Sequence, residues 1–278
     1  MPYFFLILIF LLGTILGSFV AVIVNRYNTG LPFFKGRSIC FSCNTKLQNK
    51  DLIPIFSFLS LKGKCRYCES KIPKETFFIE LLMGFLAVLA ALKSDFLIFN
   101  FSFFPFLVVL LIFASILLIT MYDLKHFIIP DPFLIFFSIL SLIYILIFNS
   151  NSVGWQISIF QSILSAIILT LPFLLIFLIS KGCWLGFGDV KYILVLGFFL
   201  GFSQGLSAIV LSFWIGAIFS LVALSLKKLT PHINLPLLKN NLTIKSEIPF
   251  GPFLSLGIII SFYLSVDLFQ IHELFNLF

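Results

Sequence analysis

The sequence predicts an all-α polytopic membrane protein with about eight transmembrane helices and a small loop domain that resembles a zinc ribbon. Hydrophobic residues make up 60% of the 278-residue chain and charged residues 10%, whereas soluble domains carry about 25% charged residues. The mean hydropathy is +1.16. Apolar runs near the roughly 20 residues that a helix needs to span a bilayer recur along the chain. Four of the five cysteines lie in one polar segment.

Eight apolar runs are expected to cross the membrane. They lie at about residues 2–24, 77–94, 101–121, 131–148, 156–180, 190–203, 206–226 and 252–271. No basic residue precedes the first run and no small-x-small cleavage site follows it, so we expect a retained span rather than a secretory signal. The run at 190–203 is the shortest of the eight.

These runs divide the chain into three predicted parts. Residues 1–25 form the first transmembrane helix, residues 26–76 a zinc-binding loop domain, and residues 77–278 a membrane domain of about seven helices. The limits follow from the change in composition, because the middle part is polar and carries the paired cysteines while its neighbours are apolar.

The basic residues predict the orientation of the chain. Ten of the 18 Lys and Arg residues lie between Arg26 and Lys74, and in an alternating eight-span topology only Lys93 falls on the opposite side. Cytoplasmic loops hold the excess of Lys and Arg, so we expect the zinc loop on the cytoplasmic side and both termini outside. This topology accounts for nearly all of the net charge of +7. We therefore expect the lipid bilayer as a partner and no nucleic acid.

The cysteines of the loop form two CxxC pairs, Cys40 with Cys43 and Cys65 with Cys68, separated by 21 residues. This spacing is typical of a zinc ribbon, in which four thiolates hold one ion tetrahedrally. A loop of about 50 residues gains its fold from such an ion. Two disulfides or free thiols are the alternative, and a reducing cytoplasm disfavours disulfides. We expect Cys183 to be a buried apolar side chain.

Asp123 and Asp189 lie at the ends of apolar runs, where a carboxylate is costly and marks a candidate functional site. The eight-span topology puts both on the cytoplasmic side. Two carboxylates that share one proton can activate water to hydrolyse a peptide bond. Asp123 as an interfacial charge and Asp189 as a helix N-cap remain alternatives. Asp131, after Pro130, is predicted to be an N-cap.

Gly186 and Gly188 precede Asp189. Because glycine lacks a Cβ, we expect these residues to let a substrate backbone approach and to adopt dihedral angles that other residues avoid.

The ordered motifs of the whole chain resemble those of the type IV prepilin peptidases. These motifs are Gly17-Ser18-Phe19, the CxxC pairs around Asp51-Leu52-Ile53-Pro54, Asp123 followed by Pro130-Asp131, Gly186 to Lys191, and Ile248 to Phe253. The combination covers nearly the whole chain, whereas a GxGD sequence alone is a weak signal.

The resemblance implies a GxGD-type aspartyl protease of the bacterial inner membrane. Such enzymes remove the leader of type IV prepilins or type II secretion pseudopilins on the cytoplasmic side. It also implies Asp123 and Asp189 as the catalytic pair and the four paired cysteines as metal ligands. Many members then methylate the new amino terminus with S-adenosylmethionine.

The segment linked to methyl transfer departs from the family pattern at two places. Ala21 replaces an Asn that many members carry, and Glu75-Thr76-Phe77 stands where they have Arg-Tyr-Pro. The sequence therefore supports proteolysis more firmly than methylation. Glu80 is a candidate residue for the methylation site, with packing at a helix end as its alternative role.

Two other classes of function fit parts of the pattern. A transporter would use intramembrane carboxylates to relay protons or cations, but no inverted repeat is visible and both aspartates are expected on one face. A non-enzymatic scaffold would recruit partners through the zinc loop, but it leaves Gly-x-Gly-Asp without a role.

Overall fold

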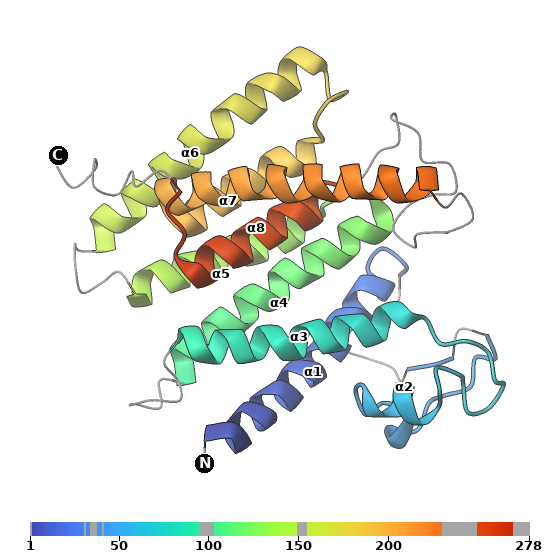
Figure 1. The fold of residues 1–278 in the computed structure, drawn as a ribbon. Coiled ribbons are helices and arrows are strands. Elements are labelled where there is room, and N and C mark those ends of the chain that lie inside the picture. The colour runs from blue at the N-terminus through green and yellow to red at the C-terminus, as the bar shows by residue number, and fades with distance from the viewer. Residues whose placement is uncertain are drawn as a thin grey trace. The chain divides into compact units, whose positions relative to one another are not determined.

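A computed structural model describes residues 2–30, 32–33, 38–40, 42–94, 103–148, 155–229 and 249–268 (Figure 1). The described residues are helical apart from loops and two isolated β-bridges. The helices are α1 (Pro2–Arg26), η1 (Asn49–Asp51), α2 (Phe56–Ser60), α3 (Lys74–Lys93), α4 (Phe103–His126), α5 (Asp131–Phe148), α6 (Trp155–Ser180), α7 (Phe187–Leu229) and α8 (Gly251–Leu264).

Six of these helices, namely α1, α3, α4, α5, α6 and α7, are long and apolar enough to cross a membrane. Helix α7 has 43 residues and is interrupted at Gly201, where φ is 74° and ψ is −171°. Its two parts correspond to the predicted runs at 190–203 and 206–226. Helix α8 is apolar and has 14 residues. The two parts of α7 and α8 correspond to the last three predicted runs, but α8 ends at Leu264, inside the run predicted at 252–271, and is shorter than a membrane span. The expected all-helical membrane fold, with six to eight apolar helices, is confirmed.

Some of the sequence predictions fall outside the described residues. They are residues 101–102 of the third run, Ile248 of the last motif, the end of the eighth run after residue 268, and the basic residues Lys35, Arg37, Lys239 and Lys245.

The chain forms two compact units, residues 1–118 and 119–278, and α4 passes from the first unit into the second. Unit 1 contains the cysteine loop, and unit 2 contains both aspartates. The predicted domain limits at residues 25 and 76 remain predictions.

In unit 1, α1 packs against α3. The close approach depends on Gly13 and Gly17, which lie one helical turn apart on α1. A Cβ at Gly13 would lie 2.5 Å from the Cβ of Ala87, and one at Gly17 would lie 2.8 Å from the Cα of Glu80. Glycines four residues apart are a common means of close packing between membrane helices. Here they bring the Gly17-Ser18-Phe19 motif against Glu80.

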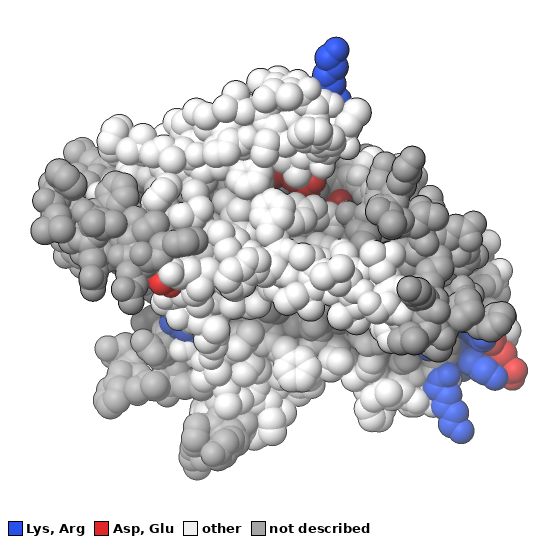
Figure 2. Space-filling view, turned by 45° about the horizontal axis from the view of Figure 1, so that its top comes forward, with Lys and Arg blue, Asp and Glu red and all other residues white. Residues whose placement is uncertain are grey.

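In unit 2, α7 packs against α5, α6 and α8. Aromatic rings fill this interface. Phe199 of α7 lies 5.5 Å from Phe137 of α5 and 5.0 Å from Phe262 of α8, measured between ring centroids. Figure 2 shows a face on which most of the described side chains carry no charge. Ile179 is 76% exposed and Leu221 65%, as expected for helices that face lipid.

Candidate functional site

The four paired cysteines come together in unit 1. The Sγ atoms of Cys40, Cys43, Cys65 and Cys68 all lie within 4.8 Å of one another, and those of Cys40 and Cys68 are 3.8 Å apart. Four sulfurs at about 2.3 Å from a tetrahedral zinc ion are separated by about 3.8 Å. The cluster therefore fits a structural zinc ion, and none of its cysteines forms a disulfide.

The two CxxC pairs share one backbone design. In the first, the N–H of Cys40 donates to the carbonyl of Thr45 and the N–H of Asn44 donates to the carbonyl of Cys40. In the second, Cys65 donates to Ser70 and Glu69 donates to Cys65 in the same way. An isolated antiparallel bridge closes each turn. This repeat gives the cluster an approximate internal symmetry that sequence spacing alone does not reveal.

Hydrogen bonds favour the thiolate form of one cysteine in each pair, Cys40 and Cys68. The backbone N–H groups of Cys43 and Ser42 lower the pKa of the Cys40 thiol to about 6. A hydrogen bond with the Ser70 side chain contributes most to lowering the pKa of Cys68. Thiolates rather than thiols bind metal ions, so these contacts favour the ligand form.

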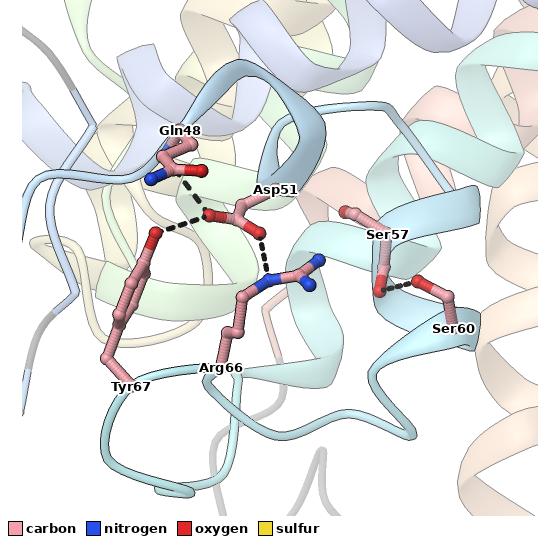
Figure 3. A network of polar contacts seen from close by, with 6 residues as sticks. All are labelled: Gln48, Asp51, Ser57, Ser60, Arg66 and Tyr67. Carbon is pink, nitrogen blue, oxygen red and sulfur yellow. Dashed lines mark hydrogen bonds and ion pairs between the residues drawn. The ribbon is translucent and has the colours of Figure 1, made fainter.

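A polar network around Asp51 braces the second CxxC pair (Figure 3). The Asp51 carboxylate accepts hydrogen bonds from the Arg66 side chain at 2.7 Å, the Tyr67 hydroxyl at 3.1 Å and the Gln48 N–H at 3.1 Å. Its side chain is 3% exposed. Burial raises the pKa of Asp51, but the three hydrogen bonds outweigh burial and hold the pKa below its usual value. Asp51 thus connects η1 to the turn between Cys65 and Cys68.

Glu80 is a buried carboxylate on α3 where motifs from distant parts of unit 1 meet. Its Oε2 accepts a hydrogen bond from the N–H of Ile55 at 2.7 Å, and Ser18 of α1 bonds to it through its side chain. Ile55 precedes α2 with φ of 61°. Glu80 therefore holds the start of α2 against α1 and α3. Its predicted part in methylation stays a prediction.

Asp123 lies in the last turn of α4 and is 5% exposed. The helix ends at His126, three residues after Asp123, because Phe127 has a φ of 56°. The N–H of Phe127 bonds back to the carbonyl of Asp123 at 2.8 Å. Asp123 Oδ2 accepts a hydrogen bond of 3.2 Å from the N–H of Gly251, the first residue of α8. The free N–H groups at a helix start favour a negative charge. The carboxylate is therefore paired with a helix N-terminus.

Asp189 lies in the first turn of α7 and is half-buried. Helix α7 begins at Phe187, so Asp189 is inside the helix rather than at its N-cap. The charge of Asp123 acts on Asp189. Burial and this proximity make it unfavourable for both carboxyls to be ionised at once.

Ile129 lies between the segments that carry the two aspartates. A Cβ at Gly188 would lie 3.2 Å from the Cβ of Ile129, and a Cβ at Gly251 would lie 3.4 Å from its Cδ1. The same side chain thus contacts the residue before Asp189 and the residue that bonds to Asp123. The end of α4, the start of α7 and the start of α8 meet around Ile129.

The predicted roles of the neighbouring residues need three corrections. Neither Gly186 nor Gly188 has a positive φ; positive values near this loop occur at Lys181 and Gly182. The backbone at Gly188 is not left-handed; a Cβ there would instead make a tight contact with Ile129, which would have to move by a few tenths of an ångström. Asp131 is the first residue of α5, so Pro130 precedes the helix, and the Asp131 carboxylate pairs with Lys191.

The third correction concerns Cys183, which is exposed rather than buried. It lies in the turn between α6 and α7, where an apolar side chain is not covered by neighbouring helices.

Sequence reasoning missed Gly251 and Ile129 as parts of the site. Gly251 belongs to the last motif of the chain, but nothing in the motif shows that its N–H reaches a carboxylate 128 residues earlier. Ile129 is one apolar residue among many. Only the tertiary structure distinguishes them.

Two family models match this chain. "Bacterial Peptidase A24 N-terminal domain" matches residues 11–94, and "Type IV leader peptidase family" matches residues 110–221. The cysteine cluster and Glu80 lie in the first range, and both aspartates lie in the second. The first model thus covers the cysteine motifs, and the second covers the two aspartate motifs that follow them in the chain.

Curated relatives agree with these models. A Bacillus subtilis prepilin leader peptidase/N-methyltransferase is 29% identical over 92% of this chain and 92% of its own length. The protein of that name from Stutzerimonas stutzeri is 25% identical over 92% of this chain and 89% of its own. One from Vibrio cholerae is 38% identical, over 29% of this chain and 35% of its own length.

No solved structure matches the chain. The second family model describes a leader peptidase, and the relatives that align over nearly all of their length are named prepilin leader peptidase/N-methyltransferase. The chain is a multi-pass membrane protein that belongs to the type IV prepilin leader peptidase/N-methyltransferase family, a family of aspartic-type endopeptidases.

Proposed function

We propose that the chain removes the leader peptide of type IV prepilins or type II secretion pseudopilins, with Asp123 and Asp189 as the catalytic pair. The observation that carries this proposal is the meeting of both aspartates around Ile129, where the charge of one acts on the other.

The chemistry follows from the shared proton. The ionised aspartate accepts a proton from a water molecule as the water oxygen attacks the scissile carbonyl carbon. The protonated aspartate donates a hydrogen bond to the carbonyl oxygen and then helps to protonate the departing amine. The C–N bond breaks, and the products are a carboxylate and a free amino terminus.

The surroundings of the pair suit a peptide substrate. The Gly251 N–H keeps Asp123 oriented. Gly186 is exposed, and a Cβ there would lie 3.3 Å from Asp189 Oδ2. Glycine at this position leaves room for an extended backbone beside the carboxylate.

The site belongs, in this proposal, to the cytoplasmic face of the bacterial inner membrane. The support is the distribution of basic residues, of which ten of 18 lie between Arg26 and Lys74. Lys125 and Lys191 are close in sequence to the two aspartates. A prepilin would bind with its apolar helix in the lipid and its basic leader at this face.

The test is cleavage of a leader-bearing prepilin in membranes by wild type, Asp123→Asn and Asp189→Asn. Asn keeps the shape of the side chain but cannot exchange the proton, so each variant should lose at least about 10³-fold in kcat. Asp131→Asn is a matched control, because it removes a carboxylate that pairs with Lys191 and is not linked to the other two. It should keep most of the activity.

Membrane insertion of each variant is checked by extraction and by protease protection. Full cleavage by either inserted aspartate variant would contradict the aspartyl mechanism and would favour the transporter or scaffold interpretations.

We further propose a second activity, N-methylation of the new amino terminus, in unit 1. The relatives are named as N-methyltransferases, and S-adenosylmethionine would supply the methyl group. An amine must be neutral to accept a methyl group. Glu80 is the buried carboxylate that can bind this amine and receive its proton. Ile55 and Ser18 hold the carboxylate in place.

Glu80→Gln separates this role from packing, since Gln keeps the size and can still accept the Ile55 N–H. The expected result is loss of the methyl mass from the product, at least about tenfold in rate, with leader cleavage retained. Mass spectrometry of the product with and without S-adenosylmethionine measures both steps. Unchanged methylation would restrict Glu80 to a structural role.

The four cysteines are proposed to hold a structural zinc ion. A closed set of four thiolates leaves no position for a substrate. The ion would stabilise the loop that carries α2 and its contact with Glu80.

A further inference from the structure

A buried chain of hydrogen bonds in unit 2 ends at Asp123. The Tyr192 hydroxyl of α7 lies 2.8 Å from Ser255 Oγ of α8. Ser255 Oγ donates in turn to the carbonyl of Gly251 at 3.0 Å. The N–H of Gly251 donates to Asp123 Oδ2 at 3.2 Å. Because the Ser255 proton is used for Gly251, the Tyr192 hydroxyl is the donor in its bond to Ser255.

The position of Tyr192 connects this chain to the second aspartate. Tyr192 follows Asp189 by three residues on α7, so the two side chains lie on the same face of the helix, one turn apart. The charge of Asp123 also acts on the Tyr192 hydroxyl. The chain therefore runs from the helix of one aspartate to the carboxylate of the other.

Packing alone does not require the hydroxyl. Tyr192 is fully buried, and its ring lies 6.3 Å from that of Phe137. A phenylalanine ring would fill the same space without the cost of burying a hydroxyl group. Ser255 satisfies its own proton within α8, so its bond to Tyr192 is not needed to pair Ser255. The remaining effect of the Tyr192 hydroxyl is to fix the position of the first turn of α8 relative to α7.

We propose that Tyr192 and Ser255 are positioning residues that hold the start of α8 against α7 and thereby direct the Gly251 N–H at Asp123. Neither residue acts on substrate. Their effect is to fix the first turn of α8, and with it Asp123, at a constant spacing from Asp189. This inference rests on the proposed function of the two aspartates.

The test uses the full chain in detergent or nanodiscs, with a leader-bearing prepilin as substrate. Tyr192→Phe removes one oxygen atom and should lower kcat about three- to tenfold, the effect of one lost hydrogen bond, with KM changed less than about twofold. Tyr144→Phe is the control: Tyr144 of α5 is a half-buried ring in the same aromatic cluster, 5.4 Å from the ring of Phe199. It should leave kcat and KM unchanged.

A double-mutant cycle distinguishes positioning from general stability. Ser255→Ala should lower kcat by at least as much as Tyr192→Phe. Adding Tyr192→Phe to Ser255→Ala should cause no further loss, because both act through one chain. Thermal unfolding midpoints of Tyr192→Phe and Tyr144→Phe should agree.

Three results would overturn the proposal. They are wild-type kcat in Tyr192→Phe, losses of kcat that multiply in the double variant, and a fall in kcat that follows a fall in the unfolding midpoint. Asp123→Asn is measured beside them. If Asp123→Asn still cleaves, the proposed function fails; if it does not cleave while Tyr192→Phe is fully active, only the positioning role fails.

Discussion

At the scale of single residues, the site depends on what can approach a carboxylate. Asp123 is nearly inaccessible, and the atom that meets it is a backbone nitrogen at the start of a helix. That contact needs a residue without a side chain at position 251. The position of the Asp123 carboxylate therefore depends on the absence of a side chain at Gly251.

Gly251→Ala tests this requirement. The added Cβ would lie 2.5 Å from Asp123 Oδ2, far inside van der Waals contact, so the carboxylate or the start of α8 must move. Cleavage should fall at least about 10²-fold, because small displacements of catalytic groups cost this much. The unfolding midpoint should change little in comparison.

Gly216→Ala is the control for Gly251→Ala. It adds a Cβ that would lie 3.3 Å from the ring of Phe253, which can rotate or shift. It should keep most of the activity. Equal activity of Gly251→Ala and Gly216→Ala would show that Asp123 does not need its close contact with α8.

At the scale of elements, the cysteine loop is built from two turns of the same design and one polar network. The network around Asp51 joins η1 to the second turn and buries a carboxylate with three donors. A buried charge is stable only while its partners are in place. Asp51 therefore contributes to the loop in its ionised form.

Asp51→Asn should weaken zinc binding about fivefold, since metal binding and folding of such a loop are linked. One charge-assisted interaction with a partly exposed partner, here Arg66, is worth about 1 kcal/mol. The pKa of Asp51 in the folded state is lowered. Its contribution to the stability of the folded loop is therefore complete at pH values above the usual pKa of an aspartate, and it is lost as the pH falls through the lowered pKa. The defect should be constant between about pH 6 and pH 8.

Competition with a chelating dye measures the zinc affinity of wild type and Asp51→Asn at several pH values. Glu69→Gln makes the same change of charge at an exposed position of the second turn and is the control. A defect of equal size in both variants would show a general effect of charge near the metal instead of an effect of the network.

At the scale of the whole molecule, the two candidate sites belong to different compact units. The cysteines and Glu80 lie in residues 1–118, and the aspartates with Ile129 and Gly251 lie in residues 119–278. Each site is held by contacts within its own unit. We therefore expect a substitution that disrupts the cysteine site to have a smaller effect on the aspartate site than on the cysteine site, and the reverse.

Removal of zinc tests this separation. A strong chelator, or Cys40→Ser with Cys43→Ser, should unfold the loop and expose residues 38–72 to limited proteolysis, because the loop has few buried apolar residues to hold it without the ion. Amides of α7 and α8 should remain protected from hydrogen exchange. Elemental analysis should give one zinc per chain.

Two results would contradict this expectation. A zinc-free loop that resists protease would show that packing suffices for its fold. Loss of protection in α7 and α8 would show that the units depend on each other.

The sequence predicts those features of the molecule that depend on patterns among residues close to one another in the chain. CxxC spacing is local, so the sequence identifies four candidate metal ligands, and the structure brings them together. The eight apolar runs are also local, and even the separate runs at 190–203 and 206–226 correspond to a break at Gly201. The GxGD motif identifies Asp189 as a candidate, but it does not predict that neither of its glycines has a positive φ.

The sequence by itself determined the membrane-helical class, the cysteine cluster as a candidate metal site and the aspartates as candidates, because composition, period and motif spacing are properties of neighbouring residues. Only the tertiary structure decided that Gly251 bonds to Asp123, that Ile129 lies between the two aspartate segments and that Tyr192 meets Ser255. Each of these contacts joins residues on different elements. Helix packing creates them, and in a uniformly apolar sequence no local pattern specifies which helices meet.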